Sequence, residues 1–270
     1  MLCTECVLAL PISNGMSKLL RDISIIGKNE LLIQVRNPLW LVFGLFQPIV
    51  YLLLFSPFLS GIANTPGFPS DSAIQFFAPG MLIMNVLFGA TFAGFGLIDQ
   101  LRTGFIERIR VTPISRVSIA LGFVLRSPVV LIIQSLILLV VAVLFFNLEV
   151  DLTGTLILIL LLTIIGIAMA SLSYTIALIV KDEGTLAAIT NFFTLPLFLL
   201  AGVMLPVEFA PKIIQDIAKY NPFTYAVDAA RTLINGSLDD RSVVLAFISF
   251  VIIGILALIW FIRSMRNAVA

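Results

Sequence analysis

The feature that most constrains this chain is a series of long apolar stretches that are almost free of charged residues. A helix that crosses the hydrocarbon core of a bilayer needs about 20 consecutive, mainly apolar residues. Six stretches meet this requirement: residues 39–59, 76–98, 119–146, 152–180, 185–205 and 243–262. Because a helix satisfies its own backbone hydrogen bonds inside lipid, the sequence predicts an all-α integral membrane protein with six transmembrane helices.

Composition supports the membrane prediction and excludes several functions. Of the 270 residues, 60% are hydrophobic and 11% are charged, whereas soluble domains are usually about 45–50% apolar and about 25% charged. The net charge of +1 offers little attraction to nucleic acid. The chain has no histidine, the commonest general base and a frequent metal ligand, and no Walker A phosphate-binding loop. We therefore expect no catalytic residue, no metal site and no cofactor in this chain.

Lysine and arginine gather in alternate connections between the apolar stretches. Cytoplasmic loops carry an excess of these residues, and residues 60–75 and 147–151 carry none. Segment 206–242 carries four, offset by five acidic residues. Arg126 lies near the cytoplasmic end of the third stretch, and the others lie in the opposite set of connections: Lys18, Arg21, Lys28, Arg36, Arg102, Arg108, Arg110, Arg116, Lys181, Arg263 and Arg266. We therefore expect a multi-pass protein of the cell membrane with both termini in the cytoplasm.

The segment before the first stretch divides into a tail and an amphipathic helix. We expect residues 1–15 to be disordered, and the sequence leaves both Met1 and Met16 as starting points for translation. In residues 16–38, apolar side chains share one helical arc, and four polar side chains lie opposite: Lys18, Arg21, Asp22 and Lys28. This pattern predicts an interfacial helix on the cytoplasmic leaflet, although packing on the protein's own cytoplasmic face fits equally well. Residues 39–270 then form the transmembrane domain.

Segment 206–240 contains two short helical patterns rather than a span. Asn221 is a good N-cap with Pro222 in the first helical position, and Gly236 is placed to end the second helix. Backbone at membrane depth must be buried in protein. We therefore expect a re-entrant or surface-lying helical hairpin on the outer side, before the last span.

The loop of residues 99–116 is cytoplasmic in this topology and carries charges of both signs. Phe105 and Ile109 lie on one helical face, and Glu107, Arg108 and Arg110 lie around the rest. A short helix of this kind suits docking into a groove on a partner protein. An ordinary positively charged cytoplasmic loop is an equally good interpretation.

Three segments resemble the ABC-2 type permease family, in particular its daunorubicin-resistance branch. They are Phe77-Ala-Pro-Gly80, Glu107-Arg-Ile-Arg-Val-Thr-Pro-Ile-Ser-Arg116 and Asn221-Pro-Phe-Thr-Tyr-Ala-Val-Asp-Ala-Ala-Arg231. Their order and the predicted topology extend the resemblance over almost the whole chain. It implies an export subunit that works with a separate ABC ATPase.

The resemblance also assigns roles to residues. Two permeases, as a homodimer or heterodimer, would sit on two ATPase copies that hold ATP and Mg, and the helix from Met16 would contact the same ATPases. The loop would supply the coupling helix, with these residues: Asp99, Arg102, Gly104, Phe105, Glu107, Arg108, Arg110, Thr112 and Pro113. The outer hairpin would cap the pathway, with these residues: Asn221, Pro222, Tyr225, Asp228 and Arg231.

Polar residues inside the apolar stretches are candidates for the path of the cargo. Such residues tend to face the protein interior, and Asn85, Phe88 and Phe92 share one side of the second stretch. The full set of candidates is Gln47, Asn85, Phe88, Phe92, Gln134 and Asn191. Interhelical packing and hydrogen bonding are the alternative role for each.

The spans lack a central ionisable residue, although ion-driven carriers commonly need one. This favours an ATP-driven exporter of a hydrophobic or amphiphilic cargo, such as a drug-like molecule, lipid or glycolipid. The alternatives are an ATPase-independent carrier or channel, and a membrane scaffold. A membrane-embedded enzyme comes last, for want of catalytic groups.

Overall fold

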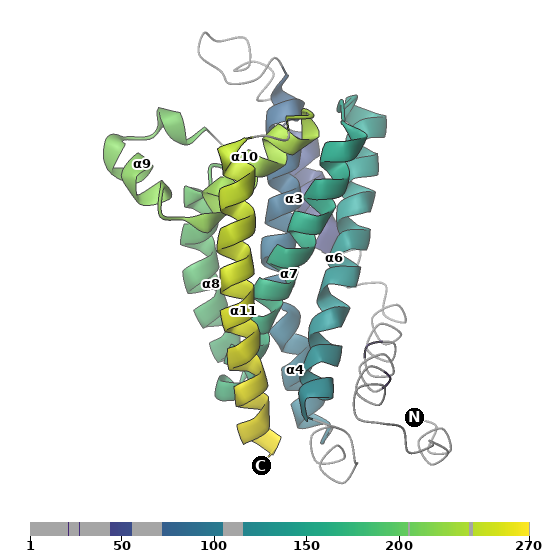
Figure 1. The fold of residues 1–270 in the computed structure, drawn as a ribbon, viewed down its shortest axis with the longest axis vertical. Helices are drawn as coiled ribbons and strands as arrows, with labels where there is room; N and C mark the ends of the chain where they lie inside the picture. The colour runs from purple at the N-terminus through teal and green to yellow at the C-terminus, as the bar shows by residue number, and fades with distance from the viewer. Residues whose placement is uncertain are drawn as a thin grey trace.

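The computed structural model describes residues 21, 27, 44–55, 72–104, 116–204, 206–237 and 240–269. These residues form helices and short connections, with no β-strand among them. The helices are Gly44–Phe55, α3 (Ala73–Thr91), α4 (Ala93–Arg102), α6 (Arg116–Phe146), α7 (Leu152–Val180), α8 (Glu183–Leu200), the 3-10 helix η2 (Val207–Phe209), α9 (Lys212–Ala218), α10 (Pro222–Ile234) and α11 (Arg241–Val269). Figure 1 shows the long helices side by side in one bundle.

Within the part of the chain that the structure describes, five helical segments are long and apolar enough to cross a membrane. They are Ile74–Arg102, Val117–Phe146, Leu152–Val180, Glu183–Leu200 and Arg241–Arg266. They correspond to the second to sixth predicted spans. The first predicted span, residues 39–59, is described only as the helix Gly44–Phe55. The predicted interfacial helix lies outside the described residues except for Arg21 and Gly27, and so does the coupling loop between Gly104 and Arg116.

Helix α7 is the centre of the bundle and packs against α3, α4, α6 and α11. Its buried face carries many small residues, including Gly166 and Ala170, which allow neighbouring helices to approach closely. The largest buried side chain, Tyr174, stacks on Phe261 of α11 at a ring-centroid distance of 5.4 Å. Its hydroxyl lies 2.9 Å from the Ser127 hydroxyl of α6. The polar group of this buried tyrosine therefore finds its hydrogen-bond partner on a neighbouring helix.

The outward faces of α6 and α11 are covered with large apolar side chains. On these two helices the most exposed large hydrophobic residues include Leu125, Ile133, Val140, Leu144, Val244, Ile248, Ile252, Ile255 and Leu256. Such surfaces would be unstable in water but match the hydrocarbon of a bilayer. The molecule is therefore a multi-pass membrane protein.

Helix α10 lies across one end of the bundle, and α9 stands beside it away from the other helices (Figure 1). Asn221 caps α10 as predicted, because its side chain accepts a hydrogen bond from Phe223 N–H. Gly236, with φ of +79°, follows the end of α10. We call this end of the bundle the α10 end, and the opposite end, where α4 finishes and α8 begins, the α4 end.

Candidate functional site

A pocket of about 570 Å³ lies between helix Gly44–Phe55, α3, α4 and α6. Five of the six predicted cargo-path residues line it: Gln47, Asn85, Phe88, Phe92 and Gln134. The sixth, Asn191, lies on the exposed face of α8 instead. This volume is within the range of about 300–1,000 Å³ typical of small-molecule sites.

One wall of the pocket is aromatic. The Phe92 ring lies between those of Phe88 and Phe95, at centroid distances of 6.3 and 5.7 Å. Phe88 also contacts Phe198 of α8 edge-on, at 5.5 Å. Phe88, Phe92 and Phe95 all line the pocket, and their large apolar surface suits the apolar body of a molecule.

Next to this wall are the amides of Asn85 and Gln134. Asn85 is 4% exposed, and its Nδ2 has no hydrogen-bond partner among the described residues. A buried donor left unpaired is costly, so the pocket offers a hydrogen bond to an acceptor that enters it. Gly44 makes room for Gln134, because a Cβ on Gly44 would lie 2.5 Å from Gln134 Nε2.

The pocket becomes charged toward the α4 end, where Asp99, Arg126 and Glu183 line it. Glu183 also forms an ion pair with Arg102, with 2.7 Å between Glu183 Oε1 and Arg102 Nη1, and this pair joins α4 to α8. Just before Glu183, the Asp182 carboxylate caps α8 by accepting from Thr185 N–H at 2.8 Å. That hydrogen bond, more than any other contact, holds the pKa of Asp182 below its usual value.

The second span is interrupted beside the pocket at Phe92, between α3 and α4. Ser173 of α7 bridges the interruption: its hydroxyl accepts from Gly94 N–H at 2.9 Å and donates to Thr91 C=O. A Cβ on Gly94 would lie 2.7 Å from the Ser173 carbonyl oxygen. The close approach of α7 and the interruption therefore depend on each other.

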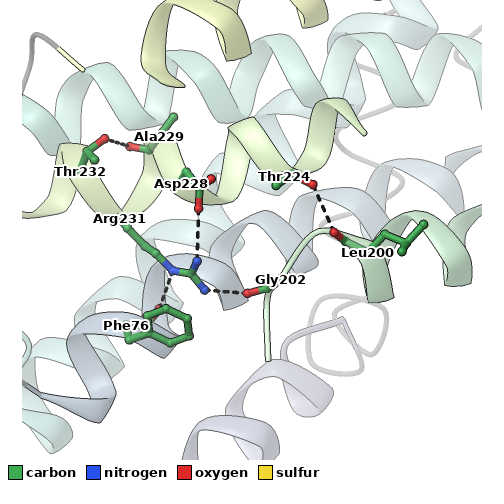
Figure 2. A network of polar contacts seen from close by, with 8 residues as sticks. All are labelled: Phe76, Leu200, Gly202, Thr224, Asp228, Ala229, Arg231 and Thr232. Atoms are coloured by element: carbon green, nitrogen blue, oxygen red, sulfur yellow. Dashed lines mark hydrogen bonds and ion pairs between the residues drawn. The ribbon is translucent and has the colours of Figure 1, made fainter. Parts of the chain in front are cut away.

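At the α10 end, Arg231 joins three parts of the chain (Figure 2). Its Nε donates to Phe76 C=O of α3 at 3.1 Å, and its Nη2 donates to Gly202 C=O, after α8, at 2.7 Å. The guanidinium carbon lies 3.6 Å from the centroid of the Phe76 ring. Asp228, at 3.4 Å, adds a longer ion pair within α10. Gly202 follows the C-terminal end of α8, where carbonyls lack helical partners, so the guanidinium satisfies Gly202 C=O and adds a second hydrogen bond to Phe76 C=O in the first turn of α3.

The other polar residues of the predicted outer hairpin also bond to the main chain. Asn221 Nδ2 donates to Leu197 C=O at 2.8 Å, and the Thr224 hydroxyl donates to Leu200 C=O at 3.2 Å, as Figure 2 shows for Thr224. The Tyr225 hydroxyl donates to Lys219 C=O at 2.7 Å. Leu197 and Leu200 lie in the last turn of α8, where carbonyls have no helical partner. The motif therefore caps its own helix and the end of α8 together.

A second set of contacts at the α10 end joins α3, the α6–α7 connection and the end of α10. Gln75 Nε2 lies 2.7 Å from both Glu149 C=O and Asn235 Oδ1. Below them, Gly154 of α7 lies so close to α10 that a Cβ would be 1.8 Å from the Leu233 carbonyl oxygen. Sequence patterns did not indicate Gln75 or Gly154, because their partners lie far away along the chain.

A helical bundle with lipid-facing surfaces and an internal amphiphilic pocket is the architecture of a membrane transport protein. The chain matches the family model described as ABC-2 type transporter over residues 21–235. It therefore belongs to the ABC-2 type transporter family, as the sequence motifs predicted. Among its relatives is a putative transport permease, ycf38, of Cyanophora paradoxa, with 29% identity over 206 residues, 75% of this chain and 70% of the relative.

Two further relatives are named for drug resistance. The probable doxorubicin resistance ABC transporter permease protein DrrC of Mycobacterium tuberculosis is 23% identical over 82% of this chain and 80% of its own length. The daunorubicin resistance ABC transporter permease protein DrrB1 of Streptomyces coeruleorubidus is 22% identical over 74% of this chain and 70% of its own length. The chain is thus a permease-type membrane component of an ABC transporter.

Proposed function

We propose that this chain is the membrane subunit of an ABC exporter that moves a hydrophobic or amphiphilic cargo outward through the pocket beside α3 and α4. A separate ATPase subunit, in two copies, supplies the energy and holds ATP and Mg. Both termini and the α4 end face the cytoplasm, and the α9–α10 hairpin covers the outer end. The names of the drug-resistance relatives favour a drug-like cargo over a lipid or glycolipid.

The pocket carries this proposal. Its aromatic wall can contact the apolar body of a cargo, and the unpaired Asn85 Nδ2 can donate a hydrogen bond to a polar group of that cargo. The charged end of the pocket faces the proposed ATPase side. An ion-driven carrier would be expected to place an ionisable relay in the middle of its spans. The pocket's ionisable residues lie instead at its α4 end.

A second permease beside α8 is part of the proposal. Helix α8 is the least hydrophobic of the five spans, and only 22% of its apolar window is buried. Its exposed face includes Asn191, and an amide facing hydrocarbon is costly. A second copy, or a related permease, would cover this face, whereas lipid covers the apolar faces of α6 and α11.

The coupling role rests on the position of α4. Asp99 and Arg102 lie in its last turn, and Gly104, with φ of +71°, turns the chain toward the segment that contains Glu107 and Arg108. Force applied to that segment would reach α4 directly, and α4 forms part of the pocket. Reversing the charges of Glu107 and Arg108 together should therefore weaken ATPase assembly and export.

The experiment that tests the function is ATP-dependent transport of a fluorescent amphiphile into inside-out proteoliposomes that hold the permease with its co-purified ATPase. We expect Asn85→Leu and Phe88→Ala to reduce transport without loss of ATPase assembly. Val140→Leu, on the lipid-facing side of α6, is the matched control. Transport that persists without the ATPase and collapses with an ionophore would establish a secondary carrier instead.

A further inference from the structure

Helix α4 combines two features that the proposed function does not use: an interrupted attachment to α3 and an ion pair to α8. From them we infer that α4 pivots about the interruption at Phe92 during transport, and that the Arg102–Glu183 pair is the latch that holds it against α8 in the state seen here. This inference rests on the proposed function. It assigns control of the charged half of the pocket to Arg102 and Glu183.

The interruption has the properties of a pivot. In a continuous helix, Gly94 N–H would donate to Ala90 C=O and Thr91 C=O would accept from Phe95 N–H. Here Phe95 N–H donates to Phe92 C=O at 3.2 Å, and the Ser173 hydroxyl serves both Gly94 and Thr91. One rotatable hydroxyl on α7 therefore replaces two rigid ladder bonds, so α4 can tilt while its end stays hydrogen-bonded.

The ion pair has the properties of a latch. The Arg102 and Glu183 side chains are 56% and 44% exposed, and a pair this exposed is weak because water competes for both charges. It joins the last turn of α4 to the first turn of α8. Arg102 also lies two residues before Gly104, where the chain turns toward the segment proposed to meet the ATPase.

Movement of α4 would change one half of the pocket and spare the other. Helix α4 contributes Phe95, Gly96 and Asp99 to the lining, whereas Asn85 and Phe88 belong to α3. Glu183, freed from Arg102, would then expose its charge to the same half of the pocket. The pivot would therefore convert a site that holds an amphiphile into one that releases it.

Reversible crosslinking of the latch tests the inference. Cys3 and Cys6 are first replaced by Ser, and then Arg102→Cys and Glu183→Cys are introduced together. The permease–ATPase complex in proteoliposomes is treated with a reducible bis-methanethiosulfonate crosslinker, and ATP-driven transport is measured before and after reduction. The control is Asp216→Cys with Lys219→Cys, which replaces an ion pair of the same 2.7 Å length at the end of α9.

We expect crosslinking to abolish transport in the Arg102/Glu183 pair, reduction to restore it, and the α9 pair to transport under both conditions. Charge reversal supplies a second readout: Arg102→Glu alone should uncouple ATP hydrolysis from transport, and adding Glu183→Arg should restore coupling. Full transport by the crosslinked Arg102/Glu183 pair would overturn the latch alone. Absence of ATP-driven transport in the untreated cysteine-free complex would overturn the proposed function, and the latch with it.

Discussion

The two ends of the helix bundle are held together by different kinds of contact. At the α10 end, Arg231, Asn221 and Thr224 donate to main-chain carbonyls at the ends of α3 and α8. At the α4 end, α4 meets α8 through a half-exposed ion pair and meets α3 across an interruption bridged by Ser173. A hydrogen bond from a charged donor such as Arg231 contributes about 1.5–3 kcal/mol, and one from a neutral donor such as Asn221 or Thr224 contributes about 0.5–1.5 kcal/mol. An exposed ion pair contributes about 0–1 kcal/mol.

This difference makes the α10 end the more rigid end of the bundle and the α4 end the more mobile one. The α10 end can keep its arrangement throughout a transport cycle, because opening it would leave several carbonyls without partners. At the α4 end, the joint between α4 and α8 rests on an exposed ion pair and can open at little cost in free energy. Variants at the two ends should therefore differ in what they damage: the stability of the fold at the α10 end, and the coupling of transport at the α4 end.

The largest loss of stability is expected from Gly154→Ala. Its Cβ would lie 1.8 Å from the Leu233 carbonyl oxygen, so α7 and α10 would have to separate, at a cost of about 3 kcal/mol. Thermal unfolding of the purified protein in detergent measures the effect. Gly254→Ala is the control, since its Cβ would meet Ala168 Cβ at an ordinary 3.5 Å. Equal melting temperatures for the two variants would show that the α10 end tolerates separation.

Arg231→Lys should have the next largest effect. Lysine keeps the charge but cannot bond Phe76 C=O and Gly202 C=O with one planar group, so we expect a loss of about 2 kcal/mol in the free energy of unfolding. Asp228→Asn, which weakens the 3.4 Å ion pair, should change the free energy of unfolding by less than about 1 kcal/mol. Denaturant titration of both variants makes the comparison, and a reversed order would contradict the role given to the backbone contacts.

Ser173→Ala should cost less stability but disturb function. It leaves Gly94 N–H and Thr91 C=O without their hydroxyl partner, and we expect a loss of about 1–2 kcal/mol. ATP turnover should continue while transport per ATP falls, because α4 loses its attachment at the pivot. Ser173→Thr, which keeps the hydroxyl, is the matched control. Unchanged transport per ATP in the alanine variant would remove the pivot from the mechanism.

The smallest change in stability is expected from Arg102→Gln. Loss of the exposed pair with Glu183 should alter the free energy of unfolding by less than about 1 kcal/mol. The ratio of transport to ATP hydrolysis should nonetheless fall, and raising the salt concentration should reproduce part of the effect in the unaltered protein. If stability fell as far as in Arg231→Lys, the two ends would not differ in the way proposed.

The spans were predictable because bilayer thickness fixes their length, whatever their neighbours are. The ends of α10 were predictable too, because Asn221, Pro222 and Gly236 mark helix ends through local backbone chemistry. The interruption at Phe92 was not predicted: no proline marks it, and the sequence shows only Gly94 and Gly96 near it. Its bridging partner is Ser173, which lies 79 residues after Gly94.

The direction in which polar residues face was harder to predict. Asn85 and Asn191 are the same residue type in two apolar spans, but Asn85 is buried beside the pocket and Asn191 is exposed on α8. A helix that is apolar all round gives no periodicity from which to choose an inward face. Glu183 was missed as a pocket residue because it lies directly after a predicted cytoplasmic turn, where a charge is ordinary.

The two-residue turn between α7 and α8 bears on how the protein enters the membrane. Helix α8 has marginal apolar character, whereas α7 is strongly apolar, and the chain reverses between them at Lys181, with φ of 56°, and Asp182. The lower hydropathy of α8 makes its own partition into the bilayer less favourable than that of α7. With so short a turn, the favourable partition of α7 into the bilayer carries α8 along, and the two helices enter as one hairpin. Membrane insertion of α8, whose exposed face is proposed to meet a second permease, is thus aided by the hydrophobicity of α7.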